Sequence, residues 1–278
     1  MNLYDDPKLQ LLICLLAAHT LADFTLQTRS DVKTKRNWTT LIRHTATHAG
    51  LAYLFAGLWT AWILPPAVLV SHAAIDAVKA RMKEPGARAF LVDQAVHVAA
   101  TAALAVWLAP DRGGLYWVEL AGSVYLKALI LITGTVLTVL AGGHLIALAV
   151  RPFLSQLEPP AADRLEATSS DRLGTPAPGR RGMVAGDRRG ASLPKGRGFP
   201  HGGLVIGRLE RALILLFVLT GNPAGIGFLF AAKSILRFGE VRDSQHRMEA
   251  EYIIIGTLMS FGYGMLLAYV TRAALMQS

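Results

Sequence analysis

The sequence predicts an all-α fold, a polytopic membrane bundle of helices. Hydrophobic residues make up 53% of the 278 residues, and the mean hydropathy is +0.39. The apolar residues occur in long blocks instead of short periodic stripes, which is typical of membrane spans. The loops between these blocks alternate between strongly basic and almost uncharged, as expected when they face opposite sides of a membrane.

Six apolar runs are long enough, or nearly long enough, to cross a bilayer. They cover roughly residues 9–28, 38–64, 66–81, 88–109, 123–150 and 250–271. Two shorter runs, 204–220 and 222–238, are joined by Gly221-Asn222-Pro223. They form either two short spans or a re-entrant hairpin. We therefore expect about six spans plus a short helical hairpin, eight apolar segments in all.

Four regions follow from this pattern. Residues 1–110 form a four-helix core bundle that carries most of the histidines, and residues 120–151 form a long fifth span. Residues 152–203 are rich in Pro, Gly, Arg and Ser without apolar periodicity, so we expect a disordered basic linker in the cytoplasm. Residues 204–278 hold the two short segments and the last span.

The loop charges predict the orientation. The basic loops follow the first span, join the third to the fourth, and precede the last, so they and the linker face the cytoplasm and both termini face outward. The net charge of +9 is spread over these loops, which favours contact with membrane lipid headgroups. No basic face with interleaved aromatic residues appears, so no nucleic-acid partner is expected. The single cysteine, Cys14, allows no intrachain disulfide.

Every His, Asp and Glu inside the first four predicted spans belongs to a pair spaced by four residues. This spacing places both members on one face of a helix. The pairs are His19 and Asp23, His44 and His48, His72 and Asp76, and Asp93 and His97.

The four pairs also fall at one depth. Neighbouring spans run in opposite directions, so each pair can be ordered by its distance from the cytoplasm. His19, His48, His72 and His97 form a deeper layer. Asp23, His44, Asp76 and Asp93 form a shallower layer about 6 Å away, because a helix rises about 1.5 Å per residue. All eight lie in the cytoplasmic half.

Buried ionisable groups are costly in a membrane and seldom persist without partners. Imidazole and carboxylate groups are ligands for divalent metals, so we predict a site for one or two ions, zinc first. All eight residues are candidate ligands. Gln27, Gln94 and Lys79 are candidate supports for them, although each also suits a capping or snorkelling role. The alternative is a metal-free network of hydrogen-bonded pairs.

The motifs that carry these pairs, taken together and in this order, resemble those of a known family. "HTLADFTLQ", "HTATH", "SHAAID" followed by Lys79, "DQAVH" and the late "GFLFAAKSILRFGE" together resemble an uncharacterised bacterial membrane family, the domain of unknown function 3307. The N-terminal motifs cover about the first 100 residues. The resemblance implies a protein of the bacterial inner membrane. More distantly, the His/Asp pairs are similar to those of predicted inner-membrane metal-dependent hydrolases.

Three functions fit these residues. The first is a metal-dependent hydrolase that cleaves a lipid-like ester, amide or phosphoester at the cytoplasmic leaflet, with Asp76 or Asp93 taking a proton from water. The second is a transporter of divalent metal or protons, and the third is a structural scaffold. The outer halves of the four spans contain no ionisable group. This favours a site that opens only inward, and so a hydrolase.

Overall fold

The computed structural model describes residues 4–27, 37–79, 86–111, 114–157, 202–238 and 247–277, and every regular element within these ranges is helical. The all-α prediction is therefore confirmed for this part of the chain. Two of the elements, η1 and η2, are π-helices. The elements are α1 (Pro7–Leu21), η1 (Ala22–Leu26), α3 (Trp38–Ala56), α4 (Leu64–Lys79), α5 (Ala87–Leu108), α6 (Tyr116–Thr135), η2 (Val136–Ala141), α7 (Gly142–Leu157), α9 (Gly202–Leu219), α10 (Ala224–Phe238) and α11 (Arg247–Met276).

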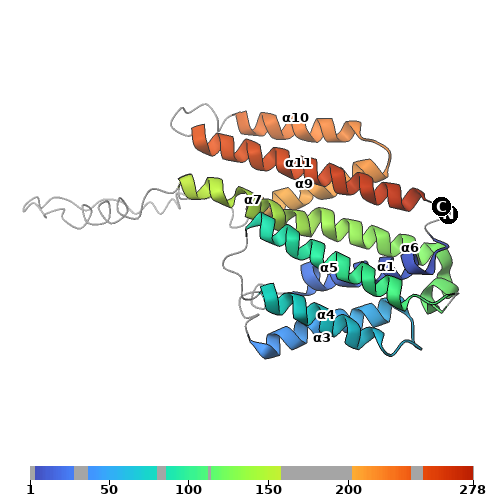
Figure 1. Ribbon diagram of the computed structural model, residues 1–278. Helices are drawn as coiled ribbons and strands as arrows, with labels where there is room; N and C mark the ends of the chain where they lie inside the picture. The colour runs from blue at the N-terminus through green and yellow to red at the C-terminus, as the bar shows by residue number, and fades with distance from the viewer. Residues whose placement is uncertain are drawn as a thin grey trace, which may run out of the picture.

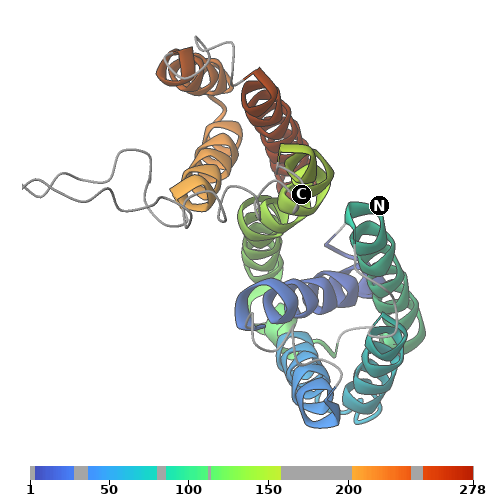
Figure 2. The same ribbon diagram turned by 90° about the vertical axis from the view of Figure 1, so that its left-hand side faces the viewer.

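The helices lie side by side and alternate in direction, and both ends of the chain lie at the same end of the array (Figure 1). The continuous helix formed by α6, η2 and α7 runs through the middle. It separates a group made of α1, α3, α4 and α5 from a group made of α9, α10 and α11 (Figure 2). Within the first group α1 packs against α3 and α5, and α4 packs against the same two helices; α1 also packs against α6 of the central helix. The four predicted histidine-bearing segments therefore surround a shared interior.

The turn between α3 and α4 differs from the expected one. The sequence placed the turn at Pro65-Pro66, whereas α3 ends at Ala56 and both prolines lie in the first turn of α4. Gly57 closes α3 in the left-handed conformation with φ 58°, which glycine adopts without steric strain. Proline is tolerated in the first turn of a helix, where its missing N–H has no intrahelical partner.

The boundaries of the fifth span and of the linker can be compared with the structure. α6 begins at Tyr116, but the non-helical Gly122 (φ 58°) breaks it, so the uninterrupted part of the fifth span begins at residue 123 as the sequence predicts. Residues 152–157 continue α7 as a helix that includes Pro152, so the predicted linker begins later than expected. Residues 158–201, the rest of that linker, lie outside the described part of the chain.

Among the described residues, four helices are long and apolar enough to cross a membrane: Pro7–Leu26, Ala87–Leu108, Tyr116–Phe153 and Glu251–Met276. A shorter apolar helix covers Ala224–Ile235. Large apolar side chains such as Trp62, Val70, Leu120 and Phe228 are exposed on the outer faces of the array. A soluble monomer rarely leaves this much apolar surface in contact with water.

Aromatic side chains connect α6 to the end of α3. Trp117 Nε1 donates to the carbonyl of Leu54 at 2.6 Å, and the Tyr125 hydroxyl donates to the carbonyl of Phe55 at 2.7 Å. These bonds satisfy carbonyl groups at the helix end, which lack partners inside the helix. They fix α3, and with it His44 and His48, against the central helix.

The contact between α6 and α11 depends on a glycine. A Cβ atom on Gly134 would lie 2.2 Å from Thr271 Oγ1 and 2.5 Å from Thr271 Cγ2. We expect Gly134→Ala to lower the free energy of unfolding by about 1–3 kcal/mol because overpacking forces the helices apart. Thermal unfolding of the purified protein in detergent measures this. Gly50→Ala in α3 is the control, since its Cβ meets nothing within 4 Å. Equal midpoints for the two variants would contradict the packing argument.

Candidate metal centre

The structure brings the eight paired residues together. Each pair points from its helix into the interior between α1, α3, α4 and α5, and all eight side chains are at least nine-tenths buried. We call this set the His/Asp cluster. Its members are His19, Asp23, His44, His48, His72, Asp76, Asp93 and His97.

The four histidines that the sequence places in the deeper layer are neighbours. The ring centroids of His48 and His72 lie 3.6 Å apart, and those of His72 and His97 lie 4.3 Å apart. The His19 ring lies 5.3 Å from the rings of His48 and His97 and 5.4 Å from that of His72. One residue from each of four helices therefore contributes to a single imidazole layer.

Asp23 lies at the centre of the contacts between the two layers. Its Oδ1 accepts a hydrogen bond from His48 Nε2 at 3.1 Å and lies 3.3 Å from His44 Nε2. Its Oδ2 lies 3.8 Å from His19 Nε2 and accepts from Gln94 Nε2 at 3.2 Å. Within the described residues, the Asp23 carboxylate contacts imidazoles and an amide but no lysine or arginine. It is the buried anion that joins α1, α3 and α5.

Asp93 has a different environment. Its Oδ2 accepts from the Lys79 ammonium group at the end of α4 and from Gln94 Nε2 at 3.3 Å. Lys79 therefore pairs with Asp93 on the next helix, not with Asp76 on its own helix.

Asp76 is 1% exposed, and its Oδ2 lies 3.5 Å from His44 Nε2. The three supporting residues named from the sequence all touch the cluster, since Gln27 Nε2 lies 3.3 Å from His44 Nδ1.

Hydrogen bonds define which nitrogen of two imidazoles carries the proton. His97 Nδ1 lies 2.9 Å from the backbone carbonyl of Asp93, which can only accept, so this nitrogen donates. Gln94 Nε2 faces two carboxylates, so Gln94 Oε1 faces His19 Nε2 at 3.4 Å and accepts from it. The opposite nitrogens, His97 Nε2 and His19 Nδ1, carry the lone pairs. Both are buried without a hydrogen-bond partner within the described structure, as is His72 Nε2.

These donors lie close enough together to share an ion. Three sets of ligand atoms, each set within 4.8 Å, include every member of the cluster. The first set is His19, Asp23, His48 and His72, the second is His44, His72 and Asp76, and the third is Asp76, Asp93 and His97. His72 and Asp76 each belong to two sets. The arrangement can therefore hold one ion, or two ions that share ligands.

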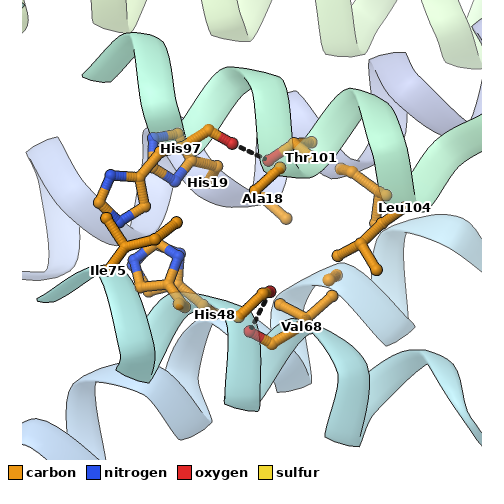
Figure 3. Close-up of a pocket in the computed structure, with 13 residues that line it drawn as sticks. Ala18, His19, His48, Val68, Ile75, His97, Thr101 and Leu104 are labelled. Atoms are coloured by element: carbon orange, nitrogen blue, oxygen red, sulfur yellow. Dashed lines mark hydrogen bonds between the residues drawn. The ribbon is translucent and has the colours of Figure 1, made fainter. Parts of the chain in front are cut away.

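A cavity borders the imidazole layer on the side away from the aspartates. Figure 3 shows His19, His48 and His97 on one side of the cavity and Leu104 and Val68 on the other. Its volume is about 20 Å³, room for one or two water molecules or a small group. Ser71 and Thr101 also line it, but their hydroxyls donate to the carbonyls of Val68 and His97 on their own helices. Apart from the imidazoles, the cavity wall is thus mainly apolar.

The residues of this cavity wall were not predicted from the sequence. Thr101 follows His97 by four residues and Ala52 follows His48 by four, so helical spacing alone could have placed both on the interior face.

The sequence analysis left three further histidines out of the site. His144 is exposed, and its ring packs 5.1 Å from that of Phe90. His201 and His246, also excluded, lie outside the described residues.

Comparison with known proteins finds one family model that matches the segment carrying the cluster. Residues 11–113 match the family described as protein of unknown function (DUF3307). The matched segment contains all eight residues of the His/Asp cluster, whereas the late block that begins at Gly227 lies outside it. No curated protein and no solved structure matches the chain. Residues 11–113, with α1, α3, α4 and α5 around their shared interior, are therefore similar to the family of unknown function 3307, as the sequence motifs predict.

Proposed function

We propose that the chain is a membrane-embedded, metal-dependent hydrolase that acts on a lipid-like ester, amide or phosphoester. The observation that carries this proposal is the convergence of three carboxylates and five imidazoles from four helices within the interior of the bundle. A protein that needed only hydrogen-bonded pairs would not gather eight such groups at one place, because each added ionisable group raises the free energy of burial.

The donor set suits a divalent cation. His19, His72 and His97 present unpaired ring nitrogens, which are the atoms a metal binds. His97 donates its other ring N–H to a backbone carbonyl, and this partner is common for a metal-ligating histidine. The mixture of nitrogen and oxygen donors favours zinc, with iron or manganese as alternatives. We propose one or two ions held by the eight residues of the cluster.

A bound divalent cation would supply Lewis-acid activation of water and of the substrate's carbonyl or phosphoryl oxygen. Residues of the chain would accept the proton that the attacking water loses. Asp93 is held at Oδ2 by Lys79 and Gln94, while its buried Oδ1 has no hydrogen-bond partner within the described structure. Asp93 Oδ1 is thus the best-placed general base. Asp76, shared by two sets of ligands, suits a bridging position.

The lining of the cavity favours an apolar group. Leu15, Ala18, Val68 and Leu104 surround the space next to the imidazoles, and no aspartate of the cluster lines it. Because the cavity holds only about 20 Å³, a lipid-like substrate would have to widen it to bring its reacting group to the imidazoles. The same wall offers no chain of charged or free polar groups leading away from the cluster, which argues against a transport path.

We also propose the membrane topology. The helix ends that border residues 28–36, 80–85, 158–201 and 239–246 lie at one end of the array (Figure 1), and these segments hold most of the basic residues of the loops. By the positive-inside rule this end faces the cytoplasm of a bacterium, and both termini face outward. In this arrangement α1, α3, α4, α5, the α6–α7 helix and α11 are six spans, and α9 and α10 form the short hairpin.

The first prediction concerns metal content. Protein purified gently in detergent should contain one or two zinc-like ions per chain, measured by elemental analysis. His19→Ala, His48→Ala or His72→Ala should release them, because each removes a ligand of the first set. His144→Ala is the matched control, since this histidine is exposed and lies outside the cluster. No stoichiometric metal in the unaltered protein, or equal loss in the control, would argue against the proposed centre.

The second prediction concerns catalysis. With zinc supplied, the protein should hydrolyse long-chain 4-nitrophenyl esters or bis(4-nitrophenyl) phosphate. Asp93→Asn should lower the rate by about 10²- to 10⁴-fold, the usual contribution of a general base. Asp93 also belongs to a ligand set, so elemental analysis of the variant distinguishes a lost proton acceptor from a lost ion. Absorbance of the released nitrophenolate gives the rate.

The transporter alternative is tested in proteoliposomes. Metal or proton flux should be absent across vesicles that contain the purified protein. A flux that depends on the added metal and disappears in Asp76→Asn would replace the hydrolase with a transporter.

A further inference from the structure

The two π-helices of the chain lie against each other. η1 ends the first span and contains Asp23, and η2 interrupts the long central helix at residues 136–141. The two elements are in direct contact. A π-turn widens the helix and shifts the residues that follow around the axis, and such turns occur frequently at functional sites. The element that carries Asp23 thus packs directly against η2.

Side chains from the second half of the chain hold η2. Arg211 of α9 donates from Nη2 to the carbonyl of Val139 at 2.9 Å, and the Tyr263 hydroxyl of α11 donates to the carbonyl of Leu137 at 3.0 Å. Arg211 Nη1 also donates to Ser260 Oγ at 3.1 Å. Backbone carbonyls in an apolar environment need such partners when the helix geometry is disturbed. α9 and α11 thus bind η2 on the side opposite α1 (Figure 2).

Burying the charged guanidinium of Arg211 inside the bundle costs free energy. The residue is 3% exposed. Added Cβ atoms on Gly143 and Gly207 would lie 2.8 Å and 3.2 Å from its guanidinium nitrogens, so the guanidinium packs closely against both glycines. The adjacent Glu210 is paired with Lys233 at 2.6 Å instead. No carboxylate forms an ion pair with Arg211 within the described residues. A buried charge kept at this cost points to a role beyond general packing.

We infer that Arg211 is a positioning residue, supported by Tyr263, that holds η2 against η1 and thereby fixes Asp23 in the His/Asp cluster. The predicted effect on metal affinity rests on the proposed metal centre. The predicted link between η2 and η1 rests only on the contacts described above. It gives the C-terminal helices, which lie outside the matched family segment, a direct part in building the site.

Two variants test the link. Arg211→Met removes the donors while keeping an unbranched apolar side chain, and Tyr263→Phe removes one hydroxyl with little change in packing. The control is the double variant Glu210→Gln with Lys233→Met, which removes the neighbouring ion pair on α9 and α10 but no bond to η2. Arg211→Lys keeps a cation that can reach one carbonyl and should restore part of the effect.

The first measurement is amide hydrogen exchange of the full chain in detergent without metal. Arg211→Met and Tyr263→Phe should speed exchange in peptides covering residues 19–27 and 136–143, whereas the control should leave both unchanged. A general loss of packing would speed exchange throughout the chain, so a local change distinguishes positioning from stability. If Arg211→Met does not fold, Tyr263→Phe decides the outcome alone. Unchanged exchange at residues 19–27 in a folded variant would overturn the inference.

The second measurement is cobalt binding, followed by the visible d–d spectrum and by competition with a chelator. Arg211→Met should weaken cobalt affinity by about 10- to 100-fold, the range seen when a residue that orients metal ligands is lost, and should alter the spectrum. If the unaltered protein binds no cobalt while exchange still responds, the metal centre fails and the link stands. If it binds cobalt and no Arg211 or Tyr263 variant changes affinity or exchange, the link fails and the metal centre stands.

Discussion

The contact of the Asp23 carboxylate with the imidazoles around it is the constraint on which the rest of the structure depends. A buried carboxylate in an apolar bundle needs hydrogen-bond donors, and Asp23 receives them from His48 and Gln94, on two further helices, with His44 beside them. The donors must approach from α3 and α5, so these helices turn their polar faces toward α1. The bundle interior is arranged around this anion, and the apolar side chains face outward or fill the space beyond it.

The cluster separates two kinds of chemistry by depth. Carboxylates, an ammonium group and amides lie on one side of the imidazole layer, and a mainly apolar cavity lies on the other. Each imidazole has two nitrogens on opposite sides of its ring, so one can face the polar network while the other is left to a ligand. His97 illustrates this, since Nδ1 binds a backbone carbonyl and Nε2 remains unpaired. The proposed hydrolase would use this boundary between a polar site and an apolar substrate.

The central helix makes the two halves of the chain one unit. The helices α1, α3, α4 and α5, which surround the His/Asp cluster, lie on one side of it, and α9 and α11 pack on the other (Figure 2). Its π-helix η2 contacts η1, and its N-terminal end is bonded to the end of α3 through Trp117 and Tyr125. Tyr4, which donates to the carbonyl of Ala274 at 2.8 Å, adds a direct contact between the two termini. The geometry of the cluster is thus supported by residues far outside the matched family segment.

The sequence by itself determined the all-α class and the four pairs that the structure brings together. These features follow from the fixed rise and rotation of a helix and from the alternating direction of spans, so spacing is enough to predict them. It misplaced the α3–α4 turn, because Pro65 and Pro66 suit the first turn of a helix as well as a loop. Only the tertiary structure decided that Lys79 pairs with Asp93, that Gln94 bridges Asp23 and Asp93, and that η2 supports η1. Such contacts depend on how each helix is rotated and packed against its neighbours, which local periodicity does not specify.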